Sequence, residues 1–161
     1  MSEPRTATQF ILRGLLLPFS NENLLLTYKP SRFFYELSKI SGHREQTLRT
    51  AFSRAKHSGL IKIDDNALPR LTSRGKLKAA PFVSEKLSNK GRLLVIFDIP
   101  VSRGSTRRDF RQLLKNLGFK QVQQSVWVTD NDRRKIIIEA IAEYQLDGCV
   151  EFYEAARLHP K

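Results

Sequence analysis

Cationic and hydrogen-bonding side chains are concentrated in residues 44–58, REQTLRTAFSRAKHS. Apolar residues recur there at the i, i+3, i+4, i+7 positions typical of a helix, and Gly59 stands where such a helix would stop. With the apolar stripe buried, the basic, hydroxyl and imidazole groups face outward together. Such a face can neutralise phosphates and hydrogen-bond the edges of bases. The same pattern also describes an ordinary solvated helix, so both interpretations stay open.

The segments around this helix predict how it would be positioned. Two further helices are predicted before it, and two short strand candidates, LIKID and LPRLT, follow it around the turn residues Asp64, Asp65 and Asn66. Helix, helix, turn, helix and β-hairpin is the order of a winged helix-turn-helix domain, in which the last of these helices enters the DNA major groove. We therefore expect the outward residues of 44–58 to contact DNA.

The expected contacts fall into two classes. Groove contacts are expected from Arg49, Thr50, Ser53, Arg54 and His57. Phosphate contacts are expected from Arg44 and Lys56 on the helix, from Lys62 and Arg70 on the hairpin strands, and from Arg74 just beyond them.

The charge of the chain indicates a polyanionic partner. The formal net charge is +12 at pH 7, and residues 1–91 hold 16 Lys and Arg against 7 Asp and Glu, whereas residues 92–161 hold 12 against 9. The polyanion-binding surface is therefore expected mainly in the first half, with nucleic acid as the first candidate. No apolar run is long enough to span a bilayer, and the N-terminus has no apolar signal core, so we expect no membrane association and a cytoplasmic location.

The chain is predicted to form two domains. Residues 1–79 form the winged helix-turn-helix domain, and residues 80–91, bracketed by Pro81 and Gly91, have the composition of a linker or a short connecting helix. Residues 92–161 show the order strand, helix, strand, strand, helix, strand, which is typical of a ferredoxin-like sandwich with one sheet face free to dimerise. The predicted fold class is α+β.

Several separated motifs resemble one known family. LRTAFSRAKHSGLI, residues 48–61, is similar to the recognition helix and first wing strand of PaaX-type transcriptional repressors, and LTSRGK is similar to the short helix after their wing. LLVIFDIP, the paired Arg107 and Arg108, LGF at 117–119 and SVWV at 125–128 resemble their central domain, itself similar to the small CRISPR-associated protein called Cas-two. These repressors carry a further C-terminal domain, which we expect this chain to lack because it stops at Lys161.

The resemblance to Cas-two implies a metal site at Asp98. There the carboxylate that ends the first strand binds a divalent ion for phosphodiester hydrolysis, so Asp98 would be a Mg²⁺ ligand here. One carboxylate suits Mg²⁺ poorly, and the family's arrangement brings two such residues together across a homodimer. The alternative is structural, because an Asp before Ile-Pro readily accepts hydrogen bonds from the following turn. Arg107, Arg108 and Arg111 leave a similar choice between a solvated helix face, which we favour, and an auxiliary phosphate contact.

Together the residues and the resemblance predict a double-stranded-DNA-binding transcriptional regulator, a repressor that binds as a homodimer and needs no cofactor. The alternative is a Cas-two-like metal-dependent nuclease, or a CRISPR adaptation subunit, with Mg²⁺ at Asp98. A third hypothesis is an architectural protein whose basic surface contacts an acidic protein. The single Cys149 and the three histidines form no nucleophilic or zinc set.

Overall fold

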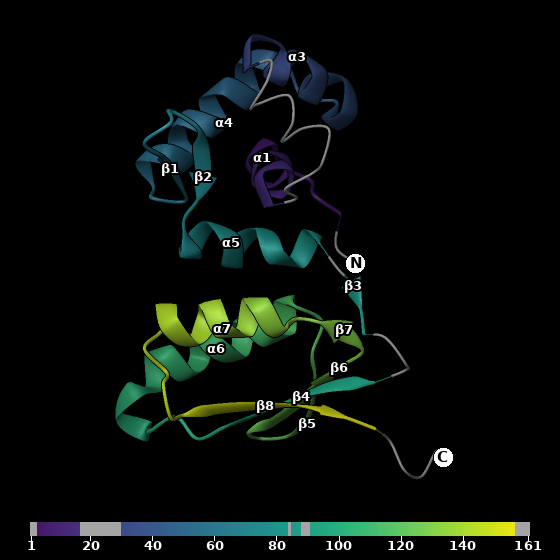
Figure 1. Ribbon diagram of the computed structural model, residues 1–161, viewed down its shortest axis with the longest axis vertical. Helices are drawn as coiled ribbons and strands as arrows, with labels where there is room; N and C mark the ends of the chain where they lie inside the picture. The colour runs from purple at the N-terminus through teal and green to yellow at the C-terminus, as the bar shows by residue number, and fades with distance from the viewer. Residues whose placement is uncertain (1–2, 17–29, 84, 88–90, 157–161) are drawn as a thin grey trace. The chain divides into compact units, whose positions relative to one another are not determined.

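The computed structural model describes residues 3–16, 30–83, 85–87 and 91–156 of the chain. The chain divides into two compact units, Met1–Val83 and Ser84–Lys161, and both contain helices and strands (Figure 1). All pairs of neighbouring strands are antiparallel. The fold is therefore a mixed α+β fold, as predicted.

The first unit consists of helices and one small β-hairpin. Its elements, in chain order, are α1 (Ala7–Leu16), α3 (Pro30–Ser41), α4 (Glu45–His57), β1 (Ile61–Ile63), β2 (Pro69–Leu71), α5 (Ser73–Ala79) and the 3-10 helix η1 (Ala80–Phe82). Ile11 of α1, Phe33 of α3 and Leu48 of α4 are fully buried in one apolar core. The residues at helical spacing in the sequence are thus the ones that fill the core.

Aromatic packing holds α3 against α4. The Phe34 ring of α3 meets the Phe52 ring of α4 edge to face, with the ring centroids 5.6 Å apart. The two helices are joined by a short turn that begins at Gly42, whose φ of 69° lies in the left-handed region that glycine adopts without strain. The turn and the ring contact together leave the polar side of α4 facing outward.

The hairpin that follows α4 is stabilised at its tip by Asp64. Its strands pair Ile61 with Leu71 and Lys62 with Arg70. Asp64 Oδ1 accepts hydrogen bonds from the backbone N–H groups of Asn66 (3.0 Å) and Leu68 (2.8 Å). An Asp side chain that captures its own turn in this way is a common means of closing a loop.

A threonine and a glycine fix α5 beneath the hairpin strands. Thr72 is the N-cap of α5, and its Oγ1 accepts a hydrogen bond from the Gly75 N–H at 3.1 Å. Gly75 is buried, and a Cβ at this position would lie 2.1 Å from the backbone oxygen of Leu60. Only glycine allows the helix to approach the backbone at Leu60 this closely.

The second unit is a four-stranded sheet with two long helices. Its elements are β3 (Glu85–Lys86), β4 (Arg92–Phe97), the 3-10 helix η3 (Val101–Arg103), α6 (Gly104–Asn116), β5 (Lys120–Gln123), β6 (Val126–Thr129), β7 (Asn131–Asp132), α7 (Arg134–Glu143) and β8 (Val150–Ala155). The strand order in the main sheet is β5-β6-β4-β8, and α6 and α7 both lie on one face of it (Figure 1). None of the described helices is long and apolar enough to cross a membrane.

The side chains of β4 point alternately to the two faces of this sheet. Leu93, Val95 and Phe97 are buried, and the Phe97 ring meets Phe110 of α6 edge to face at 5.3 Å. Leu94, between the buried residues, is only partly covered. Helices α6 and α7 therefore cover the face of the sheet that carries Leu93, Val95 and Phe97.

The segment predicted as a linker, residues 80–91, contributes to both units. Ala80 and Phe82 are buried in η1 of the first unit, whereas Glu85 pairs with Asp132 in the β3-β7 pair of the second. The division between the units falls after Val83, within the predicted segment.

Candidate nucleic-acid interface

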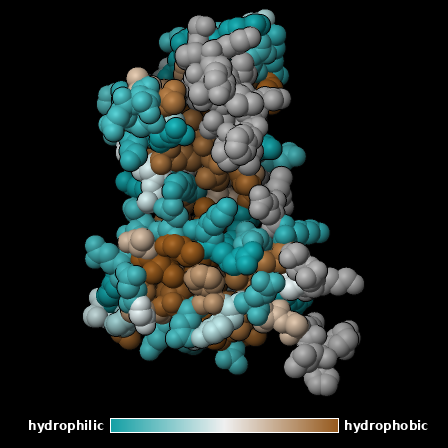
Figure 2. All heavy atoms as spheres, viewed as in Figure 1, coloured by the Kyte–Doolittle hydropathy of each residue, from teal (hydrophilic) through white to brown (hydrophobic). Residues whose placement is uncertain are grey.

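All ten residues that the sequence predicts as DNA contacts are exposed in the structure. They are Arg44 at the N-cap of α4, Arg49, Thr50, Ser53, Arg54, Lys56 and His57 on α4, Lys62 on β1, Arg70 on β2 and Arg74 on α5. On the face shown in Figure 2, hydrophilic residues gather over the β1-β2 hairpin of the first unit. The first unit therefore presents the predicted groups to solvent, where a polyanion could reach them.

Arg49 is held by contacts within its own unit. Its guanidinium donates hydrogen bonds to Glu45 Oε1 from Nε (2.9 Å) and Nη2 (2.6 Å). The guanidinium also lies over the Phe34 ring of α3, 4.6 Å from the centroid. The ion pair is the i, i+4 kind and the ring contact is a cation–π interaction, so Arg49 ties α4 to α3.

Arg70 is held in the same way by a carboxylate of the hairpin. Its Nε donates to Asp64 Oδ2 at 3.0 Å. This hydrogen bond from Arg70, followed by the backbone hydrogen bond from Leu68, lowers the pKa of Asp64 below its ordinary value. Asp64 therefore fixes the orientation of the Arg70 guanidinium on the hairpin.

The remaining predicted cations have no such restraint. Within the described part of the chain, no hydrogen bond or ion pair holds the charged groups of Arg44, Arg54, Lys56, Lys62 and Arg74. Arg54 and Lys56 lie in the last turn of α4, where positive charge also suits the helix dipole. These five are the cations best able to move onto phosphate groups.

Two polar side chains of α4 are hydrogen-bonded to the helix itself. Thr50 Oγ1 donates to the Gln46 carbonyl at 2.9 Å, and His57 Nδ1 lies 2.8 Å from the Ser53 carbonyl. Because a carbonyl only accepts, Nδ1 carries a hydrogen, and in the neutral ring Nε2 is left as an acceptor. Gln46 was not among the predicted DNA contacts. It is nevertheless exposed in the first turn of α4, on the same side of the helix as Thr50 four residues later.

Asp98 follows the last residue of β4 and is exposed. Its backbone N–H donates to the Cys149 carbonyl at 2.8 Å, which continues the β4-β8 pairing by one residue. The Asp98 carboxylate accepts no hydrogen bond from the described residues of the following turn. Asp98 is therefore held to the neighbouring strand by its backbone, and its side chain makes no hydrogen bond to the described residues of the turn.

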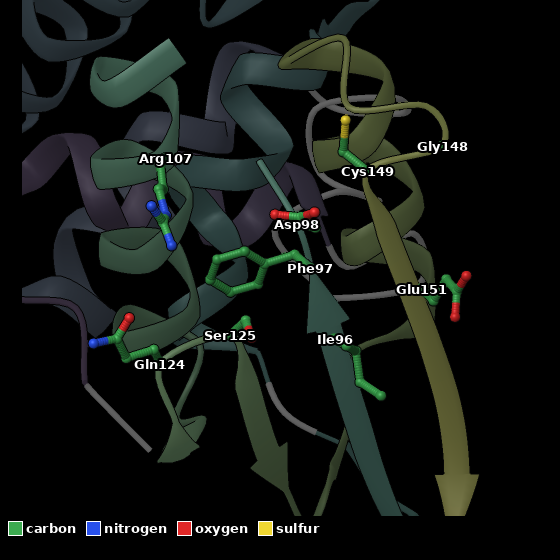
Figure 3. A pocket seen from close by; sticks show the side chains of 9 residues that line it. All are labelled: Ile96, Phe97, Asp98, Arg107, Gln124, Ser125, Gly148, Cys149 and Glu151. Atoms are coloured by element: carbon green, nitrogen blue, oxygen red, sulfur yellow. The ribbon is translucent and has the colours of Figure 1, made fainter. Parts of the chain in front are cut away.

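A pocket of about 280 Å³ adjoins Asp98. In Figure 3, Arg107 extends from α6 toward Phe97 and Asp98, whereas the Cys149 thiol and the Glu151 carboxylate point away from Asp98. Arg107 is half-buried and its Nε finds no hydrogen-bond partner among the described residues.

The three arginines of α6 differ in their surroundings. Arg108 is exposed, and Arg107 lies at the pocket beside Asp98. Arg111 donates from Nη2 to the Gln124 carbonyl at 3.0 Å and lies over the Phe97 ring. Arg111 thus links α6 to the turn between β5 and β6. Of the three arginines, Arg108 alone has the solvated position that was expected for all of them.

The described residues of one chain do not form a cluster of magnesium ligands around Asp98. Among the described residues, no three His, Cys, Asp or Glu side chains are grouped so that they could hold a metal ion. Mg²⁺ prefers near-octahedral oxygen coordination, of which the Asp98 carboxylate could supply only part, with water or phosphate oxygens filling the rest. Among the described residues, Asp98 is thus not part of a cluster of metal ligands.

The sheet face opposite α6 and α7 carries apolar side chains at its centre, with Glu151 beside Ile96 and Lys120 beside Val128 on the two edge strands. Leu94 pairs with Val128 on one side and Tyr153 on the other, and Ile96 pairs with Val126, which places all five on one face. Tyr153 is 48% exposed, and the other four are partly covered. We refer to Leu94, Ile96, Val126, Val128 and Tyr153 as the open sheet face.

Comparison with known proteins relates the second unit to one family. No curated protein and no solved structure matches the chain. Residues 89–161 match a family model described as the PaaX protein central Cas2-like domain. This segment spans the main sheet with α6 and α7. The second unit is therefore similar to the central domain of PaaX proteins.

Proposed function

We propose that the chain is a transcriptional regulator of the PaaX type, a repressor that binds double-stranded DNA as a homodimer. The observation that carries the proposal is the group of unrestrained, exposed cations around α4 and the hairpin: Arg44, Arg54, Lys56, Lys62 and Arg74. Cations of this kind bind the phosphate backbone and release its counterions. The match of residues 89–161 to the PaaX central domain supports the regulatory assignment.

The element order of the first unit supports a winged helix-turn-helix assignment. Helices α3 and α4 are joined by a turn, and the β1-β2 hairpin follows α4 directly. In domains of this type the helix in the position of α4 lies in the major groove, and the hairpin lies beside it. The proposed DNA contacts on α4 and the hairpin strands then belong to one bound duplex.

The strand order of the second unit supports a ferredoxin-like assignment, and its open sheet face supports the homodimer. A group of apolar side chains left partly exposed on a sheet face marks a surface for association, and an isologous contact through that face would pair two copies. Two copies of α4 could then occupy successive half-sites about one turn of DNA apart. The direct test of the proposal is duplex DNA binding measured over a range of salt concentrations.

A metal-dependent nuclease remains the second candidate because Asp98 is exposed beside Arg107 at a pocket of a Cas2-like domain. Incubation of the protein with Mg²⁺ or Mn²⁺ and duplex DNA separates the two candidates. Cleavage by the wild type that Asp98→Ala abolishes would favour the nuclease, whereas binding without cleavage favours the regulator.

A further inference from the structure

Helix geometry divides the outward face of α4 into a central stripe and two flanks. Successive residues of a helix are rotated by about 100°, so the buried side at Leu48, Ala51 and Ala55 defines the opposite, outermost line. Four residues without formal charge at neutral pH lie along that line, which we call the uncharged stripe: Gln46, Thr50, Ser53 and His57. The cations of α4 lie beside this stripe rather than on it.

The flanks carry charge on both sides of the stripe. Arg49 and Lys56 lie on the flank nearer Phe34 of α3, in agreement with the contact between Arg49 and the Phe34 ring. Arg54 lies on the opposite flank together with Thr47. A helix in the major groove has base edges beneath its centre and a phosphate backbone along each side. The charge pattern of α4 matches this arrangement.

Gln46 has the most versatile side chain of the stripe. The Thr50 hydroxyl already donates to the Gln46 carbonyl, and His57 Nδ1 donates to the Ser53 carbonyl. The side-chain amide of Gln46, in contrast, has no hydrogen-bond partner among the described residues. Its planar amide presents an N–H donor beside an oxygen acceptor, the pair that matches N7 and N6 of adenine.

We infer that the uncharged stripe reads base edges, with Gln46 reading an adenine, and this inference rests on the proposed DNA-binding function. The flanking cations contact the phosphates of both strands. Gln46 lies in the first turn of α4, and the N-terminal residues of such a helix are the ones that reach the bases. Two residues that the sequence analysis expects as groove contacts take other roles in this arrangement. Arg54 is a phosphate contact with Lys56, and Arg49, tied to Glu45 and Phe34, is a positioning residue for α4.

The test compares base preference and affinity in matched variants of the full chain. Duplexes selected from a random library are sequenced for the wild type, Gln46→Ala, Thr47→Ala and Arg54→Ala, and dissociation constants are then measured on the selected site and on single-base changes. Thr47 is the control because it is exposed in the same turn as Gln46 but lies on a flank. Circular dichroism verifies that each variant is folded.

For the wild type, replacing the adenine should weaken binding by about 5- to 150-fold, the range of one good bidentate contact. Gln46→Ala should accept all four bases equally at that position and keep its preferences elsewhere, whereas Thr47→Ala should keep the adenine preference. Arg54→Ala should weaken binding to all sequences by a similar factor, because phosphate contacts carry no sequence information.

Three results would overturn the inference. If the Gln46→Ala variant keeps the wild-type base preferences, or binds all sequences more weakly by the same factor, Gln46 does not read a base. If the wild type binds duplexes without any base preference, the stripe reads nothing, although DNA binding itself stands. If the folded wild type binds no duplex at low salt, the proposed function fails together with the inference.

Discussion

Asp64 closes the tip of the hairpin, and its pKa depends on the contacts it makes there. The hydrogen bond from Arg70 lowers its pKa, and the backbone hydrogen bonds of Leu68 and Asn66 act in the same direction. A carboxyl whose pKa is lowered in the folded state stabilises the fold above its unfolded pKa, and this contribution is lost as pH falls through the lowered folded pKa. The hairpin should therefore keep its shape at neutral pH and loosen only in acid.

We predict that Arg70→Ala raises the pKa of Asp64 toward its ordinary value, because the largest cause of the shift is removed. The measurement is an NMR titration of the Asp64 side-chain carboxyl in the wild type and in the variant. Arg74→Ala, which removes an exposed cation of α5 without a described partner, is the matched control and should leave the titration unchanged. An unchanged titration in Arg70→Ala would show that the ion pair does not set the charge of the hairpin tip.

At the scale of elements, the approach of α5 to the backbone at Leu60 depends on Gly75. A Cβ at position 75 would lie 2.1 Å from the Leu60 oxygen, a backbone atom that cannot move away alone. We predict that Gly75→Ala lowers the free energy of unfolding by about 1–3 kcal/mol or more, the usual cost of overpacking. Urea denaturation followed by circular dichroism measures the change.

Gly104→Ala is the matched control for this prediction. Gly104 is also a helical glycine with an ordinary φ, but open space surrounds the position of its Cβ. The change there should be neutral or slightly stabilising, because alanine restricts the unfolded chain. Equal stability of the two variants would contradict the importance of the close approach at Gly75.

An element can be predicted from the sequence when the residues that determine it lie close together in the chain. The apolar spacing of Leu48 and Ala55 suffices to predict α4, and the turn residues around Asp64 suffice to predict the hairpin. The pairing of Arg49 with Glu45 could also be expected from their i, i+4 spacing. The β3-β7 pair could not, since Glu85 and Asp132 lie far apart in the sequence and each strand has only two residues.

The sequence predicts which residues of the candidate site are exposed, but not which other residues they contact. Exposure of the predicted contacts on α4 and the hairpin follows from the amphipathic pattern of the helix and the outward position of Lys62 and Arg70 in the strands. That Arg70 is paired with Asp64 depends on the strand register, and that Arg49 lies over Phe34 depends on how α3 packs against α4. Contacts between elements of this kind leave no periodic signal in the sequence.

In the whole molecule, binding to two half-sites requires two copies joined through the open sheet face. We predict that the wild type is a dimer and that Leu94→Arg makes it a monomer, because the change places an unpaired charge in the centre of an apolar contact. Such a charge costs several kcal/mol, enough to raise the dimer dissociation constant by about 100-fold or more. Size-exclusion chromatography with light scattering measures the mass.

Ile138→Arg provides the comparison for the dimer prediction. Ile138 is 56% exposed on α7, in the helix layer on the other side of the sheet. This variant should remain a dimer, while Leu94→Arg should also bind two-half-site DNA more weakly than the wild type. A monomeric wild type, or a dimeric Leu94→Arg variant, would show that copies do not associate through the open sheet face.

The most direct test of DNA binding is the salt dependence of affinity for duplex DNA. If the five unrestrained cations contact phosphates, the logarithm of the binding constant should fall against the logarithm of salt concentration with a slope of about −4 or steeper per protomer. Arg54→Ala should make the slope shallower by about 0.9 per protomer and weaken binding about tenfold, whereas Lys115→Ala on α6 should change neither. Binding that does not respond to salt, or an Arg54→Ala variant that binds like the wild type, would contradict the account.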